Sequence, residues 1–177
     1  MAIIYTYPSL SSIESQDSFL VTDVSDSNKT KKITLANVLS SEGLVQNKKI
    51  TLTSAQILDL HNTPVELVPT PGANKFIHVL NIYTYLDFNS IAYVTSINSD
   101  IRARYGDGTT TVQYGPVFSS SSLAKTEDFY QATPSWPGQA SDSSWLPNEN
   151  IELYCAQANS SGDSPINVYI SYIIKDL

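Results

Sequence analysis

The residue types that usually carry catalysis or bind metals are scarce in this chain and widely separated. It has two histidines, His61 and His78, and a single cysteine, Cys155. His61 follows a short predicted helix, where a histidine commonly caps the helix or interacts with its dipole. His78 and Cys155 stand in strand-like apolar runs, which predicts that both are packed residues. A metal site that combines a histidine with Asp59 or Cys155 is the alternative, but no ligand spacing favours it.

Carboxylates and serines offer a second route to chemistry. Glu127 and Asp128 are adjacent, and with Asp142 they could supply the acid and base of glycoside hydrolysis, although neighbouring carboxylates on a polar loop usually face solvent. Residues 119–122 are four serines without the strand-to-helix elbow that activates a serine nucleophile. Residues 106–108, Gly-Asp-Gly, fit a turn, because the acidic pattern of a calcium loop is absent. We therefore predict no enzyme, no catalytic residue, no cofactor and no metal site.

Binding is better supported than catalysis. Four aromatic residues crowd a loop-rich region that also contains several prolines, and rings on proline-stiffened loops bind sugars or protein grooves at low entropic cost. The alternative is that both tryptophans plug an open end of the fold or lie in a subunit interface. Arg102 and Arg104 share one face of a predicted strand and could bind a carboxylate or an acidic subunit, with ordinary surface pairing as the simpler interpretation. The candidates for contact with a receptor or glycan are Phe129, Tyr130, Trp136 and Trp145.

Composition and charge narrow the class of protein. The chain has 177 residues, of which 41% are hydrophobic and 15% charged, with eleven tyrosines, and this profile favours strands and polar loops. Residues 1–50 contain five lysines and five acidic residues, so the rest of the chain carries the whole net charge of −7. An acidic body disfavours a partner that is a nucleic acid or an anionic membrane surface. No apolar run is long enough for a membrane span, and the first residues do not resemble a signal peptide.

The N-terminal segment predicts a small hairpin that leads into a helical turn. Two short apolar runs flank a polar turn within residues 17–34, and Thr34 can then cap a helical turn over residues 35–39. Such a unit is too small to bury a core, so we expect an extended docking arm over residues 1–49. The predicted docking residues are Phe19, Leu20, Val21, Ile33, Leu35, Val38 and Leu39.

The remainder, residues 50–177, predicts a mainly β body. Strand signals follow one another without long helices between them, which favours an antiparallel β-sandwich of jelly-roll type. Thr53 and Gln56 have the spacing of a capping box and predict one short helix. Residues 119–150 predict a long loop. The predicted strands cover residues 50–53, 65–69, 76–88, 91–105, 109–114, 151–158 and 166–174.

Two of these strands have informative patterns. Residues 76–88 are apolar at even positions and aromatic or apolar at many odd ones, so one monomer would struggle to bury both faces. We therefore predict an oligomer interface at Val79, Tyr83 and Tyr85. Residues 91–105 alternate more cleanly, which predicts one packed face and one wet face. Their predicted inward residues are Ile91, Tyr93, Ile97, Ile101, Ala103 and Tyr105.

Two segments resemble known phage proteins. Residues 17–39, which read DSFLVTDVSDSNKTKKITLANVL, resemble the N-terminal module of many tailed-phage virion proteins, especially fibres. Residues 52–73, which read LTSAQILDLHNTPVELVPTPGA, the strand behind them and residues 169–175 are similar to a β-sandwich domain of phage-encoded structural proteins. The resemblance leaves residues 119–150 unmatched and implies no active-site residue. It implies a virion component, commonly trimeric, whose arm docks on the particle while the body projects.

The leading hypothesis is therefore a bacteriophage virion structural protein, either a short trimeric head fibre or a capsid-decorating protein. Its expected partners are two further copies and other virion proteins of the capsid or tail, with neither nucleic acid nor membrane insertion. Its expected location is the virion, assembled in the host cytoplasm. The alternative is a tail or baseplate fibre that binds a host-surface protein or glycan through residues 119–150. An enzyme that degrades host glycan is the weakest of the three.

Overall fold

The chain divides into two compact units. The computed structural model describes residues 14, 16–39, 43–106, 113–134 and 146–177. Its compact units are Met1–Leu44 and Val45–Leu177. The first strand of the second unit, β3 (Gln46–Leu52), starts within the polar segment that the sequence had assigned to the arm. Residues 46–49 therefore belong to a sheet, and the strand begins four positions before the expected residue 50.

The first unit contains the predicted hairpin. Strands β1 (Ser18–Asp23) and β2 (Lys29–Thr34) pair antiparallel, and α1 (Leu35–Leu39) follows directly. The turn between β1 and β2 contains the 3₁₀ helix η2 (Val24–Asp26). The backbone amides of Ser25 and Asp26 donate to the Asp23 carboxylate. Ser27 and Asn28 then adopt positive φ angles of 54° and 60°, which close the turn. The hairpin and its helical turn are confirmed.

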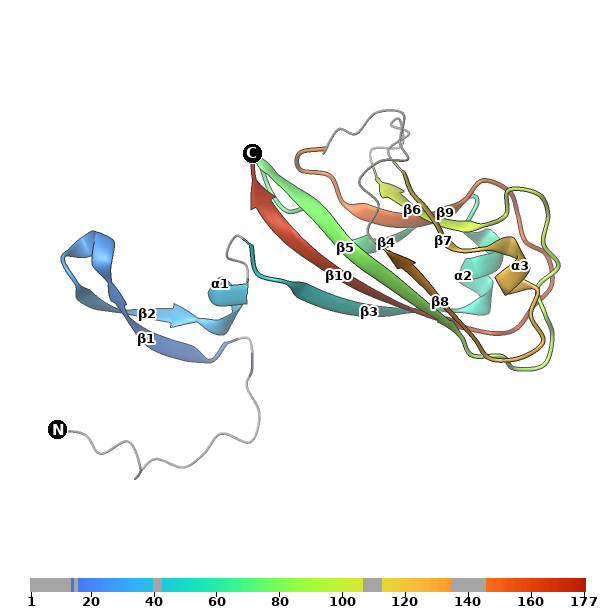
Figure 1. The fold of residues 1–177 in the computed structure, drawn as a ribbon, viewed down its shortest axis with the longest axis horizontal. Coiled ribbons are helices and arrows are strands. Elements are labelled where there is room, and N and C mark those ends of the chain that lie inside the picture. The colour runs from blue at the N-terminus through green and yellow to red at the C-terminus, as the bar shows by residue number, and fades with distance from the viewer. Residues whose placement is uncertain (1–13, 15, 40–42, 107–112, 135–145) are drawn as a thin grey trace, which may run out of the picture. The chain divides into compact units, whose positions relative to one another are not determined.

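The second unit is built from two antiparallel four-stranded sheets, and Figure 1 shows them as two layers. One sheet has the order β3-β10-β5-β8 and the other has the order β4-β9-β6-β7. The prediction of a mainly β chain with antiparallel sheets is confirmed. The remaining strands of this unit are β4 (Val65–Val68), β5 (Lys75–Leu86), β6 (Ile101–Tyr105), β7 (Gln113–Phe118), β8 (Phe129–Pro134), β9 (Ile151–Cys155) and β10 (Ile166–Asp176).

One apolar core joins the two sheets. Ile82 and Val168 from one sheet pack in the same buried cluster as Phe118 and Leu153 from the other. Tyr105 is fully buried within this core, and its hydroxyl crosses between the sheets to donate to the carbonyl of Ile77 at 2.7 Å. Because a buried polar group without a partner is costly, this bond favours the observed register of the two layers.

The helices of the second unit are short and lie toward the same end of it (Figure 1). Helix α2 (Ser54–Asp59) has the predicted capping box: Thr53 Oγ1 accepts from the amide of Gln56, and Gln56 Oε1 accepts from the amide of Thr53. The helix buries Ile57, and Leu60, which directly follows it, is buried in the same core. The prediction from the Thr53 and Gln56 spacing is confirmed, since both of its hydrogen bonds form.

A β-bulge changes the predicted faces of the longest strand. Ser171 of β10 pairs with Asn81 of β5, but the next residue, Tyr172, pairs with Val79, so Leu80 is an extra residue. A bulge shifts the alternation of side chains by one position. In β5, the odd-numbered residues before Leu80 therefore lie on the same face as the even-numbered residues after it. Val79 is therefore in the core, with 4% of its surface exposed. The predicted role of Val79 in an oligomer interface is wrong.

The segment 91–105 is a strand over a third of its predicted length, since β6 covers Ile101–Tyr105. Ile91 and Ile97 were expected to face inward, yet they are exposed, Ile97 by 86%. Side-chain hydrogen bonds compete with a strand ladder here, because Ser99 Oγ accepts from the amide of Ser96 and Asn98 has a φ of 67°. Tyr93, Ile101, Ala103 and Tyr105 are buried as predicted.

The predicted long loop over residues 119–150 is partly regular structure. It contains α3 (Ser120–Leu123) and β8, which pairs with β5 along the edge of the sheet. Leu123 of α3 is fully buried in the core, and Phe129 of β8 packs against the core. Burial of these apolar side chains holds α3 and β8 in place. Trp136, Asp142 and Trp145 lie outside the described residues.

We predict that Tyr105→Phe lowers the free energy of unfolding by about 1–3 kcal/mol, because the Ile77 carbonyl loses its buried donor. Urea denaturation followed by fluorescence measures this change. Tyr169→Phe is the matched control, because Tyr169 is exposed, and it should change stability by less than about 0.5 kcal/mol. Equal stability of Tyr105→Phe and the wild type would contradict a structural role for the cross-sheet bond.

Candidate binding surfaces

The residues with catalytic potential lie on separate elements. His61 is exposed after α2, whereas His78 is half-buried on β5, where burial and then the nearby Lys175 charge lower its pKa. Cys155 is buried on β9, and burial raises the pKa of its thiol to about 12. Within the described ranges, no group of three or more His, Cys, Asp or Glu side chains could hold a metal ion. The absence of enzymatic activity stays a prediction.

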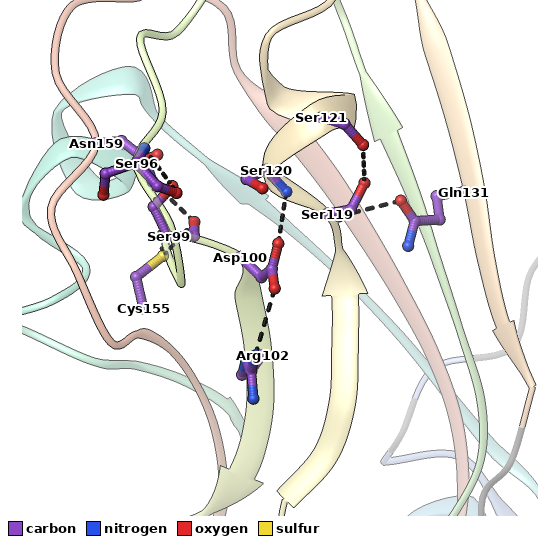
Figure 2. Close-up of polar contacts among 10 residues, drawn as sticks. All are labelled: Ser96, Ser99, Asp100, Arg102, Ser119, Ser120, Ser121, Gln131, Cys155 and Asn159. Atoms are coloured by element: carbon purple, nitrogen blue, oxygen red, sulfur yellow. Dashed lines mark hydrogen bonds and ion pairs between the residues drawn. The ribbon is translucent and has the colours of Figure 1, made fainter.

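The serine-rich segment forms a structural joint between strands. The chain runs from β7 into α3 at Ser119, so the prediction that these serines lack a strand-to-helix connection is wrong. Figure 2 shows Ser119 between Ser121 and Gln131. The Ser119 amide donates to Gln131 Oε1 at 3.1 Å, and the Ser119 hydroxyl accepts from the amide of Ser122. The Ser119 hydroxyl caps the helix, and the segment joins β7 to β8.

Asp100, which directly precedes β6, completes this joint. Its carboxylate accepts from the amide of Ser120 at 2.7 Å and forms an ion pair with Arg102 at 3.3 Å (Figure 2). Arg104, on the same face as Arg102, donates to Glu152 at 2.6 Å and lies over the Tyr154 ring at 4.2 Å. Both arginines are therefore paired with acidic side chains of the same chain, as the simpler interpretation predicted.

The hairpin presents apolar side chains to solvent. Leu20 and Val24 are 79% and 80% exposed, and Phe19 and Val21 are exposed to a lesser degree. The predicted docking residues Ile33, Leu35 and Val38 are half-buried, and the side chain of Leu39 lies outside the described part. A two-stranded hairpin is at best marginally stable alone, so exposed apolar residues on it favour a partner surface.

Ion pairs hold the turn of this hairpin. Lys31 lies 2.7 Å from the carboxylate of Asp23 and 3.0 Å from that of Asp26. The Lys31 ammonium lowers the pKa of both carboxyl groups, and these carboxylates raise the pKa of Lys31. Because the groups are exposed, such pairs add little stability to the turn.

Tyrosines cluster on the outer face of the sheet β3-β10-β5-β8. Tyr169 of β10 pairs across the ladder with Tyr83 of β5 on one side and with Lys49 of β3 on the other. Tyr85 and Tyr130 are also cross-strand partners, and their rings stack with centroids 4.5 Å apart. Tyr83 is 51% exposed and Tyr130 74%. We call this surface the tyrosine face; it comprises Asn47, Lys49, Thr51, Tyr83, Tyr85, Tyr130, Asn167, Tyr169 and Ser171.

The tyrosine face contains an open depression of about 510 Å³. One end of the face is fixed by Asp128, which accepts from the Tyr85 hydroxyl at 2.8 Å and from the amide of Phe88 at 2.9 Å. The Asp128 carboxylate raises the pKa of Tyr85 through this bond, so the phenol stays protonated as a donor. The depression is lined by Asn47, Lys48, Lys49, Tyr83, Tyr169, Ile170 and Ser171.

Sequence reasoning found part of this face and missed the rest. Tyr83 and Tyr85 were predicted as an interface, and Tyr130 as a glycan contact, but Tyr169 was not singled out. Its signal was present, because Asn167, Tyr169 and Ser171 alternate with buried residues along β10. Phe129, also predicted as a contact residue, packs against the core and meets the Phe118 ring edge-on at 6.1 Å.

An aspartate clamp holds two loops of the second unit together. The Asp163 carboxylate accepts from the amides of Ser90 and Ile91 at 3.1 and 2.9 Å and from the Ser90 hydroxyl at 2.6 Å. Asn89 donates to the same group at 2.9 Å. These donors stabilise the charged form, and the pKa of Asp163 falls to about 2. Nothing in the sequence around residue 163 predicts this role.

Comparisons with known proteins give little further guidance. No known protein family matches the sequence, and no curated protein matches it either. Among solved structures, the chain is similar to one described as "Cyanophage Pam1 capsid asymmetric unit", with 15% sequence identity and a TM-score of 0.37. That similarity covers 73% of this chain and 83% of the other. No helix in the described part of the chain is long and apolar enough to cross a membrane.

We predict that the Asp163 clamp makes stability depend on acid pH. Its folded pKa lies below the ordinary value of about 4, so the charged carboxylate stabilises the fold above pH 4. This contribution is lost as the pH falls from about 4 to about 2. Asp163→Asn should therefore lower the urea midpoint at pH 7, and its difference from the wild type should shrink across that window.

Glu127→Gln is the matched control for this pH experiment, because it removes one exposed carboxylate and the same charge. Urea midpoints measured at intervals between pH 7 and pH 2 should stay close to those of the wild type for this variant. A gap between Asp163→Asn and the wild type that stays constant down to pH 2 would show that the clamp does not act through its charge.

Proposed function

We propose that this chain is a structural protein of a bacteriophage virion and that its N-terminal hairpin attaches it to the particle. The observation that carries the proposal is that the hairpin belongs to a compact unit of its own and exposes Leu20 and Val24. A hairpin of this size needs a surface to cover its apolar side chains. Residues 17–39 resemble the N-terminal modules of phage virion proteins, which indicates that this surface belongs to a phage particle.

We infer that the second unit is a jelly roll, as the sequence predicts. The strand orders β3-β10-β5-β8 and β4-β9-β6-β7 support this inference, because β3 to β10 are distributed as two interlocked Greek keys would place them. Jelly rolls recur in capsid proteins and in lectins. Since a fold alone does not define a function, the attachment role rests on the hairpin.

Within this proposal, the leading form is a short head fibre or capsid-decorating protein that assembles as a trimer. The expectation of a trimer comes from the family resemblance. Val79, one of the three predicted interface residues, is buried in the core. Tyr83 and Tyr85 remain on the outer face of the sheet. The oligomeric state is therefore a question separate from the attachment.

A tail or baseplate fibre that binds a host-surface receptor or glycan is the second candidate function. One observation favours it: Tyr130 is 74% exposed and its ring is held by stacking on Tyr85. A rigid exposed aromatic side chain contributes binding energy with little loss of conformational freedom. Both candidates share attachment through the hairpin, and they differ in what the second unit does.

We predict that the full-length double variant Leu20→Ser and Val24→Ser binds particles lacking the protein about 10–100-fold more weakly than the wild type. The reason is the loss of two apolar side chains that attachment would bury. Co-sedimentation with such particles measures the affinity. Ile97→Ser is the control, because Ile97 is an apolar residue of the second unit that is at least as exposed as Leu20 and Val24. Equal binding of the double variant and the wild type would refute attachment through this surface.

We predict that the purified chain has three times the mass of one protomer in solution. Multi-angle light scattering at micromolar concentration measures this mass directly. A trimer at every concentration tested supports the head-fibre or decoration form. A monomer under the same conditions, in protein that still binds particles, would show that trimerisation is not a property of the chain itself.

A further inference from the structure

We propose that the tyrosine face is a glycan-binding site. This inference deepens the second candidate function, on which it rests, and it does not depend on attachment through the hairpin, since it concerns the second unit. The occupant is a chain of pyranose sugars, lying in the depression between β3 and β5. The depression has a volume of about 510 Å³ and is open, which suits a ligand that lies along the surface.

The aromatic rings provide the first argument. Tyr83 and Tyr169 are direct cross-strand partners on the exposed side of the sheet, so their side chains start about 5 Å apart. Each ring offers a flat apolar surface and a hydroxyl at its tip. A pyranose ring has the complementary form, with an apolar face of C–H groups and a rim of hydroxyls. Two neighbouring rings can thus support consecutive sugars.

The polar residues between the rings provide the second argument. Asn47 Oδ1 accepts from the Ser171 hydroxyl at 2.6 Å, and Asn167 Oδ1 accepts from the Thr51 hydroxyl at 2.7 Å. Because these bonds use the carboxamide oxygens, the amide N–H groups are the donors that each asparagine presents to a ligand. Sugar hydroxyls are suitable acceptors. Lys49, with its ammonium 5.3 Å from the centre of the Tyr169 ring, adds a donor at the edge of the depression.

The face is also held in position before any ligand binds. Asp128 fixes the Tyr85 hydroxyl, and Tyr85 stacks on Tyr130 at 4.5 Å. Tyr83 and Tyr169 project from the two central strands of the sheet, whose inner residues Ile82 and Ile170 are buried in the core. A rigid aromatic surface loses little conformational entropy on binding. It can therefore bind a ligand that makes only weak contacts, such as a sugar.

A second copy of the chain is the other occupant to consider, and the composition of the face argues against it. Asparagine, serine, threonine and lysine alternate with the tyrosines, whereas the core of a stable subunit interface is largely apolar. Lys48 and Lys49 also stand on β3, an edge strand, where lysine opposes pairing with another sheet. The trimer proposed above would therefore form through another surface, and self-association through the tyrosine face is an outcome that the test must recognise.

The test uses the full-length chain and a panel of purified oligosaccharides that includes neutral hexose chains and chains with uronic acids. Isothermal titration or NMR shift mapping measures binding at concentrations up to the millimolar range. We expect the wild type to bind at least one member, and Tyr83→Ala and Tyr169→Ala to weaken that binding about tenfold or more. Tyr83→Phe keeps the ring and should retain most of the affinity.

Two results would overturn the proposal. The first is that no oligosaccharide of the panel binds, or that binding is unchanged in both alanine variants. The second is that Tyr83→Ala lowers the solution mass of the protein, which would show that the face joins copies of the chain. Particle binding of Tyr83→Ala separates this proposal from the attachment role: it should equal that of the wild type whether or not sugar binding is lost.

Discussion

The fold of the second unit depends on burying one face of each sheet against the other. The Tyr105 hydroxyl reaches the Ile77 carbonyl at 2.7 Å across this interface, so the core has a fixed spacing as well as an apolar filling. Side chains alternate along strands, so the residues on either side of a core residue point to the opposite face of the sheet. Ile82 and Ile170 are inside, which places Tyr83 and Tyr169 outside. The tyrosine face is a consequence of the core.

The same constraint leaves four edge strands, and each has a feature that opposes pairing with another sheet. Lysines 48 and 49 lie on β3, and Pro116 and Pro134 lie on β7 and β8. Strand β4 has an irregular register between Glu66 and Val68. Such edges oppose strand pairing between the second units of neighbouring copies. Apolar residues are instead exposed on the hairpin, which agrees with attachment through the hairpin.

Much of this structure could be predicted from local sequence. The capping box at Thr53, the hairpin around residues 23–29 and the burial of Cys155 all follow from short-range patterns, and all are observed. The features that could not be predicted depend on contacts between segments that are distant in the sequence. One extra residue at Leu80 moves Val79 into the core, and the Asp163 carboxylate holds residues 89–91 in a loop. Neither effect has a signal within the segment that it changes.

The central claim is that the hairpin attaches the chain to a phage particle while the second unit keeps its tyrosine face open. A density map of purified virions that carry the protein tests it most directly. The account predicts that residues 18–39 contact a neighbouring virion protein and that Tyr83, Tyr130 and Tyr169 face solvent. A map in which the second unit is seated on the particle through its sheets, with residues 18–39 free of contacts, would contradict it.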